Sequence, residues 1–307
     1  MQIKKSAAIL GLAILLLVPF ASAGFFDFIT GKASTQNTNL SIVVNNTFPN
    51  VTVVGTTEIS SINEETFTSY SFNVSVYDHD GVRDINGTYG VTVVNVNFTN
   101  GAETPRHASC LLINSNFSTK TATYNCTVIF WYWDAPGIWN AKASANDSGG
   151  AMAYNLTQNL SVPNLFALRI YPTNITWNSS LNPGATNQTA SLSTILNNTG
   201  NIDFASGSTN YITLNSTNLS GAVNPLQIGA NLFSVGNETN PGDIECGFNL
   251  LVENQFRNVT SILYSGNLSA GAAQEELSYC LTEVPAYIEK QNYATLNPWT
   301  IKLNVVA

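Results

Sequence analysis

The residues with the clearest chemical role are asparagines that stand two places before a serine or threonine, the acceptor pattern for N-linked glycans. This pattern, the sequon, occurs twenty times in a chain of 307 residues that has 40 asparagines and 60 serines and threonines. Random placement predicts roughly 8. The excess indicates a chain that carries many glycans and works outside the cell. The acceptors are Asn39, Asn45, Asn50, Asn73, Asn86, Asn97, Asn116, Asn125, Asn146, Asn155, Asn159, Asn174, Asn178, Asn187, Asn197, Asn215, Asn218, Asn237, Asn258 and Asn267.

A second candidate for chemistry is a group of carboxylates around a glycine turn. Asp78, Asp80 and Asp84 offer the oxygen ligands that Ca²⁺ prefers, and Asp147 is a candidate for a further ligand. Their spacing differs from that of an EF-hand loop, and Asp-Gly beside a strand is also an ordinary turn signal. The sequence leaves both interpretations open and predicts no cofactor other than calcium.

The aromatic run 130–133 is a candidate binding surface. Strand periodicity places Trp131 and Trp133 on the face opposite Phe130 and Tyr132. Exposed indoles can stack on sugar rings or on a partner protein. The interpretation that we favour is that both indoles pack beneath a hinge between two domains.

The motifs of common enzymes are absent from the sequence. It contains no Gly-x-Ser-x-Gly, His-Glu-x-x-His, phosphate-binding loop or dinucleotide fingerprint. The adjacent acids Glu64–Glu65 and Glu275–Glu276 are candidates for paired catalytic carboxylates, but adjacent acids are also common on solvated loops. We therefore expect no catalytic activity and assign no catalytic residue.

Four cysteines in an exported chain predict two disulfides, for which three pairings are possible. Cys110 and Cys126 flank a predicted hairpin around 114–116, and Cys246 and Cys280 fall together in the second half of the chain. Pairing within each half gives Cys110–Cys126 and Cys246–Cys280. A zinc site is the alternative, but the sequence has no Cys-x-x-Cys and only two histidines.

The N-terminus has the features of an export signal. Two lysines precede an apolar run over 7–18, and Ala21-Ser-Ala23 matches a signal-peptidase site, so residues 1–23 are predicted to be a signal peptide. An uncleaved anchor and a pilin-type leader are the alternatives. Without those two lysines the 11 basic residues fall to 9, against 19 acidic residues. This acidic balance argues against binding to nucleic acid or to anionic lipid.

Alternating apolar and polar residues predict β-strands with one buried face. Strands are expected at 70–76, 92–98 and 154–162, the last with Tyr154, Leu156, Leu160 and Val162 inside. Because an acceptor Asn and its hydroxyl partner are two residues apart, both fall on the same face of a strand. The outward-facing acceptors are therefore predicted to be Asn73, Asn97, Asn125, Asn155 and Asn159.

Short strands separated by turn residues predict an all-β protein with two tandem Ig-like β-sandwich domains. A linker over 24–37 is followed by a first sandwich at 38–163 and a second at 164–307. The clearest strands of the second sandwich are expected at 174–177, 211–214, 247–252 and 299–305. Residues 270–281 are compatible with a helical turn or a strand.

The chain also resembles a known family. Trp131-Tyr-Trp-Asp-Ala-Pro-Gly-Ile-Trp139 and Ala145-Asn-Asp-Ser-Gly149 are similar to the late strands of extracellular Ig-like repeats. Val76-Tyr-Asp-His-Asp-Gly81 resembles a turn of the same repeats. Together with the leader and the sequons, these motifs resemble archaeal secreted cell-surface glycoproteins built from Ig-like sandwiches. The resemblance implies a surface location and no reaction.

Two functional hypotheses follow from these observations. The first is a structural glycoprotein of the cell envelope, an S-layer or a surface filament, whose partners are other envelope proteins or copies of itself. The alternative is an adhesin or carbohydrate-binding module that uses Trp131 and Trp133 to bind glycans. Both hypotheses place the protein outside the cell.

Overall fold

The computed structural model describes residues 39–55, 57–85, 94–116, 120–177, 180–205, 209–236, 246–259 and 262–305. The predicted signal peptide (1–23) and linker (24–37) lie outside these ranges. No helix within the described ranges combines the length and the apolar character that a membrane span needs.

The described chain is nearly all β structure in antiparallel sheets, which confirms the predicted fold class at this level. The helical elements in the described ranges are single short turns. They are α3 (Val82–Ile85), η2 (Ala230–Leu232) and η3 (Leu268–Ala270).

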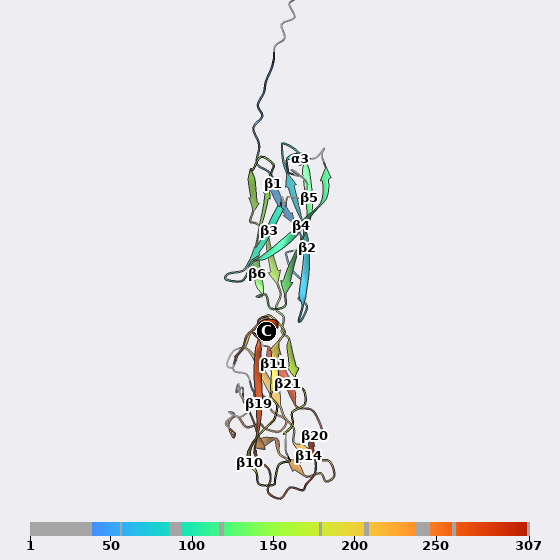
Figure 1. Ribbon diagram of the computed structural model, residues 1–307, viewed down its shortest axis with the longest axis vertical. Coiled ribbons are helices and arrows are strands. Elements are labelled where there is room, and N and C mark those ends of the chain that lie inside the picture. Colours follow the sequence, from blue (N-terminus) through green and yellow to red (C-terminus); the bar gives the residue numbers. More distant parts are fainter. Residues whose placement is uncertain are drawn as a thin grey trace, which may run out of the picture. The chain divides into compact units, whose positions relative to one another are not determined.

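The first eight strands form one sheet in the order β1-β2-β5-β4-β3-β6-β7, with β8 also paired to β6 (Figure 1). Its strands are β1 (Asn50–Val54), β2 (Phe67–Tyr77), β3 (Val94–Thr99), β4 (Arg106–Asn116), β5 (Thr121–Trp131), β6 (Gly137–Asn146), β7 (Met152–Asn155) and β8 (Asn159–Val162).

Strand β4 joins the two halves of this sheet. Its first residues pair with β3, and from Ser109 onward it pairs with β5. The sheet folds over on itself, because Phe72 of β2 contacts Phe98 of β3 although two strands separate them in the sheet. Phe98 continues the contact to Phe130, and Phe130 to Trp139. These rings are the centre of the first hydrophobic core.

The predicted disulfides both form. Cys110 and Cys126 are directly opposite on β4 and β5, with their Cα atoms 4.0 Å apart. Cys126 is fully buried beside Val128 and Phe130, as strand periodicity predicts. Cys246 pairs with Cys280, and their Cα atoms are 5.6 Å apart. Residues 114–116, where the hairpin turn was predicted, belong to strand β4, which extends to Asn116.

The later strands form four smaller sheets. Their orders are β10-β19-β11-β9 with β16 also on β19, then β12-β18, β17-β13-β21 and β15-β14-β20. The strands are β9 (Leu168–Tyr171), β10 (Thr186–Thr189), β11 (Thr194–Asn198), β12 (Phe204–Ala205), β13 (Asn210–Asn215), β14 (Leu219–Gly221), β15 (Gln227–Ile228), β16 (Phe233–Gly236), β17 (Phe256–Asn258), β18 (Ile262–Leu263), β19 (Gln274–Glu283), β20 (Tyr293–Thr295) and β21 (Thr300–Val305).

These strands enclose a second hydrophobic core. Phe233 contacts both Trp177 and Trp299, and Tyr279 lies against Trp299. The predicted strands at 211–214 and 299–305 are confirmed as β13 and β21. Both interpretations of 270–281 are correct in part, because η3 ends at Ala270 and β19 begins at Gln274.

Two predicted strands of the second half are wrong. Residues 174–177 are not a strand, although Trp177 still packs on the second core and donates from Nε1 to the Gln188 carbonyl at 2.9 Å. Residues 247–252 are interrupted because Gly247 and Asn249 have φ of 95° and 49°. A left-handed backbone cannot continue a strand, so only an isolated bridge at Leu250 forms there.

The predicted strand at 154–162 is two strands with opposite phases. Asn155 of β7 pairs with Ala143 of β6, whereas Asn159 of β8 pairs with Asn140 of β6. The chain thus advances four residues from Asn155 to Asn159 while its partner strand advances only three. A shift of one residue exchanges the inner and outer faces of a strand. Leu160 and Val162 are therefore buried as predicted, while Tyr154 and Leu156 are 53% and 65% exposed.

Contacts between residues divide the chain into two compact units, 1–45 and 46–307. Both hydrophobic cores belong to the second unit, the first within 51–162 and the second within 190–284. The predicted domain boundary between 163 and 164 falls between the two cores and stays a prediction.

Candidate functional site

The sequon asparagines whose side chains the structure describes are all exposed or half-buried. Sixteen of the twenty have described side chains, and none of these is buried. Eight are exposed: Asn39, Asn45, Asn50, Asn146, Asn159, Asn174, Asn187 and Asn258. Eight are half-buried: Asn73, Asn97, Asn125, Asn155, Asn197, Asn215, Asn218 and Asn267. Asn86, Asn178 and Asn237 lie outside the described residues, and the side chain of Asn116 is not described.

Buried asparagines do exist in the described part of the chain, but they lack the sequon. Asn198 is fully buried and Asn201 is 3% exposed, and neither has a serine or threonine two residues later. The described asparagines in sequons are therefore all at least partly accessible, and the two buried ones in the described ranges stand outside sequons. This division is the one expected if the sequons carry glycans.

The predicted outward faces are correct for three acceptors of the first core. Asn73, Asn97 and Asn125 each lie between two buried neighbours, so their side chains leave the opposite face. Asn159 is exposed as predicted. The prediction for Asn155 is wrong, because its amide points back over β1 and donates to the Val51 carbonyl at 2.9 Å.

Trp131 and Trp133 stack on each other. Their ring centroids are 4.9 Å apart with planes 12° from parallel, and Phe67 contacts the Trp131 ring edge-on. Both indoles are half-buried, and Trp133 packs on the first core. The stacking covers one face of each ring, which reduces the area that a sugar could use.

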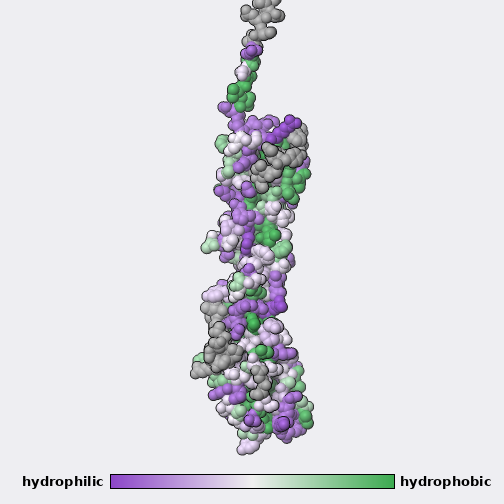
Figure 2. Space-filling model, viewed as in Figure 1, coloured by the Kyte–Doolittle hydropathy of each residue, from purple (hydrophilic) through white to green (hydrophobic). Residues whose placement is uncertain are grey.

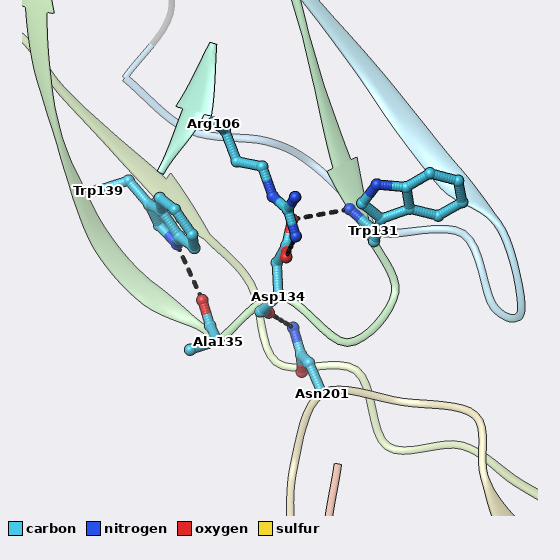
Figure 3. Close-up of polar contacts among 6 residues, drawn as sticks. All are labelled: Arg106, Trp131, Asp134, Ala135, Trp139 and Asn201. Atoms are coloured by element: carbon cyan, nitrogen blue, oxygen red, sulfur yellow. Dashed lines mark hydrogen bonds and ion pairs between the residues drawn. The ribbon is translucent and has the colours of Figure 1, made fainter. Parts of the chain in front are cut away.

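The turn after these tryptophans is held by a buried carboxylate (Figure 3). Asp134 is 1% exposed and accepts hydrogen bonds from the guanidinium of Arg106 through both oxygens, with Nε at 2.8 Å from Oδ2. The same Oδ2 accepts from the backbone N–H of Trp131 at 2.8 Å. Trp139 donates from Nε1 to the Ala135 carbonyl at 2.9 Å. A paired charge of this kind fixes the turn rather than offering a reactive group.

Asn201 connects this turn to the second half of the chain. Its Nδ2 donates to the Asp134 carbonyl at 3.1 Å (Figure 3). It also donates to the Pro163 carbonyl at 3.0 Å. Its Oδ1 accepts from the backbone N–H of Leu165 at 2.7 Å. Neither Asn201 nor Arg106 can be recognised from the sequence, since both act on partners at least 28 residues away and neither belongs to a local motif.

The first candidate acid pair, Glu64 and Glu65, is engaged in structural contacts, and the second is divided between the two faces of a strand. Glu65 accepts from Nη1 of Arg169 at 2.9 and 3.1 Å, and Glu64 accepts from the Thr199 hydroxyl. Glu275 is buried on β19 while the adjacent Glu276 is half-buried, as alternation along a strand requires. Neither pair therefore presents two carboxylates to a common space.

Three carboxylates converge at one end of the first core. Asp78 follows β2, Asp84 lies on α3 and Asp147 follows β6, and one oxygen of each lies within 4.8 Å of the others. Burial raises the pKa of Asp78, and the nearby charges of Asp84, Asp80 and Asp147 raise it further, while a hydrogen bond from the Asp80 N–H opposes the shift.

Asp80 is not part of this cluster, which corrects the predicted set of Asp78, Asp80 and Asp84. Its Oδ2 accepts from the N–H and the hydroxyl of Thr47 at 2.7 and 2.9 Å, and these hydrogen bonds lower its pKa. Asp147 takes its place, as the sequence allowed.

Comparisons with known proteins leave the family open. No family model and no curated protein matches the chain. A crystal structure from Corynebacterium diphtheriae, described as a membrane-anchored protein, is similar over 86% of this chain and 60% of its own, at 10% identity and a TM-score of 0.17. The chain thus spans less than two thirds of that protein, and a likeness at this level supports no functional conclusion.

Proposed function

We propose that this chain is a heavily N-glycosylated structural protein of a cell envelope, an S-layer or a surface filament. In this proposal residues 1–23 export it, and its two cores belong to tandem Ig-like sandwiches at 38–163 and 164–307. The observation that carries the proposal is the distribution of asparagine. None of the sixteen sequon asparagines with described side chains is buried, whereas the two asparagines that are buried in the described ranges lie outside sequons.

Further features support an extracellular setting. Two disulfides are typical of chains that fold outside the reducing cytosol. Charged residues are only 10% of the sequence, so glycans would supply much of the solubility. Hydrophobic residues on the face in Figure 2 occur in small groups between hydrophilic ones. Leu111, which is 71% exposed, is the direct strand partner of the acceptor Asn125, where a glycan would cover it.

The relation to archaeal surface glycoproteins is part of the same proposal. Its support is the turn at 134–137, where Gly137 has φ of 105°, and the fully buried Trp139 that follows. These residues have structural roles, which agrees with a family that provides a scaffold. The proposal assigns no catalytic activity.

Quantitative mass spectrometry of isolated envelopes and filaments tests the proposal. A structural component should be present in amounts comparable to the major envelope proteins, and peptide mapping should find glycans at most exposed sequons. Recovery in trace amounts, or peptides without glycans, would contradict it.

Binding to glycans through Trp131 and Trp133 is the competing function, supported by their half-exposed, stacked rings. A glycan array separates the two roles. An adhesin should bind at least one glycan, lose that binding in Trp133→Ala, and keep it in Tyr287→Ala, which removes a ring that is 99% exposed. An array without signal for the wild-type protein excludes this role.

A further inference from the structure

The carboxylates of Asp78, Asp84 and Asp147 have the spacing of ligands around a single ion. Their nearest oxygens lie within 4.8 Å of one another. Two oxygens that bind the same Ca²⁺ at 2.3–2.6 Å can be at most about 5 Å apart. One calcium ion can therefore contact all three residues.

Two of these residues also hold an oxygen that has no hydrogen-bond partner. Asp78 is fully buried, and its Oδ1 accepts from the Asp80 N–H at 2.8 Å while its Oδ2 is unpartnered. In Asp84, Oδ1 accepts from the Ser148 hydroxyl and the buried Oδ2 is likewise unpartnered. Burying a carboxylate oxygen without a donor is costly. In each residue one oxygen is thus fixed by a donor and the other is left for a ligand.

We propose that Asp78, Asp84 and Asp147 bind one Ca²⁺, with water completing the coordination. The ligands are all carboxylate oxygens, which suit a hard cation, and the cluster contains no histidine or cysteine. The ion's two positive charges would offset most of the repulsion among the three carboxylates. It would also join the end of β2, α3 and the turn between β6 and β7. This inference is independent of the proposed envelope role.

Asp147 of this cluster and the neighbouring Asp80 also hold the chain that enters the first core. Asn46 donates from Nδ2 to Oδ2 of Asp147 at 3.0 Å, and Thr47 donates to Asp80. The ion would therefore also fix the position of Asp147 as an acceptor for Asn46. Calcium binding and the docking of residues 46–47 should be coupled.

The experiment uses the full-length secreted protein, freed of metal with EGTA, in equilibrium dialysis with radioactive calcium and in thermal unfolding. We expect one Ca²⁺ per chain with half-saturation at about 0.1–1 mM, the range of extracellular calcium modules. At 10 mM CaCl₂ the Tm should rise by about 3–10 °C. The same concentration of MgCl₂ should raise it by less than half as much.

Three variants complete the test. Asp84→Asn should lower calcium affinity at least tenfold and keep the Tm of the metal-free protein at or above the wild-type value, because it removes a like charge. Asp147→Asn should lower the affinity similarly. Glu103→Gln, which removes an exposed carboxylate outside the cluster, should keep full binding. Absence of saturable binding by the wild type, unchanged affinity in a folded Asp84→Asn, or equal stabilisation by Mg²⁺ would overturn the proposal.

Discussion

Asn73 on β2 and Asn125 on β5 are directly opposite each other, and the Asn125 amide donates to Oδ1 of Asn73 at 3.2 Å. Both are sequon asparagines. The Cα atoms of such cross-strand pairs are only about 4.5–5.5 Å apart, so two branched glycans would compete for the same space.

We therefore predict that glycans at Asn73 and Asn125 exclude each other. Ser75→Ala, which destroys the first sequon, should raise occupancy at Asn125 well above its wild-type value in glycopeptide mass spectrometry. Thr99→Ala, which removes the acceptor role of Asn97 on β3, should leave it unchanged. Full occupancy of both sites in the native protein would refute the prediction.

The amide of Asn201 should contribute measurably to stability. Asn201→Ala leaves the carbonyls of Asp134 and Pro163 without their donor, which should lower the free energy of unfolding by about 2 kcal/mol in urea titration. Asn201→Asp should be at least as damaging, because it places an oxygen against both carbonyls. Asn292→Ala, at an exposed position, is the matched control. A stable Asn201→Asp variant would contradict the assigned role.

The two described ion pairs should differ in strength because of their burial. Asp134→Ala leaves Arg106 and the Trp131 N–H without an acceptor inside the protein, and should cost about 3 kcal/mol. Glu65→Ala removes a pair whose side chains are 61% and 36% exposed, and should cost much less because solvent screens the pair. Equal losses in denaturant titrations would show that Asp134 does not hold the turn.

Stability should fall in alkali through the ionisation of Tyr279. Burial raises the pKa of Tyr279 from 10.0 to about 12. A hydrogen bond with Thr194 has the opposite, smaller effect on this pKa. As the pH rises, Tyr279 therefore loses its proton in the unfolded chain before it does so in the folded protein. The free energy of unfolding should be at its full value below pH 10 and should fall by about 2 kcal/mol as the pH rises to 12.

Tyr279→Phe should remove this part of the pH dependence, at a cost of about 1 kcal/mol near pH 7 for the lost hydrogen bond. Tyr287→Phe, at a 99% exposed ring, should retain the wild-type slope. Identical slopes for Tyr279→Phe and the wild type would contradict the assignment.

The Asn46 side chain lies so close to Gly149 that a larger residue there should disturb the hydrogen bond from Asn46 to Asp147. A Cβ atom at position 149 would overlap the Asn46 amide, so Gly149→Ala should displace it from Asp147. Hydrogen exchange should then lose protection at the Thr47 N–H, which donates to Asp80, and keep it at the Ile59 N–H, which donates to Ser161. Unchanged protection at Thr47 would argue against this contact.

Local patterns in the sequence were enough to predict several parts of this fold. Alternation over 70–76 correctly placed Val74 inside and Asn73 outside, because side chains on a strand follow a fixed period of two. The pairing of Cys110 with Cys126, one of three possible, was favoured because both flank a predicted hairpin in the same half of the chain. The sequons themselves can be counted without any structure.

Contacts between distant segments were decided only by the tertiary structure. Asp147 joins Asp78 and Asp84 from more than 60 residues away, while the nearer Asp80 turns to Thr47. Asn201 reaches Asp134 across 67 residues. No local period encodes such contacts, because they depend on which turns the sheets bring to one end. The sequence thus determined the β class, the sequon positions and the strands with regular alternation. Tertiary packing determined which polar groups meet and where the alternation breaks, as it does between Asn155 and Asn159.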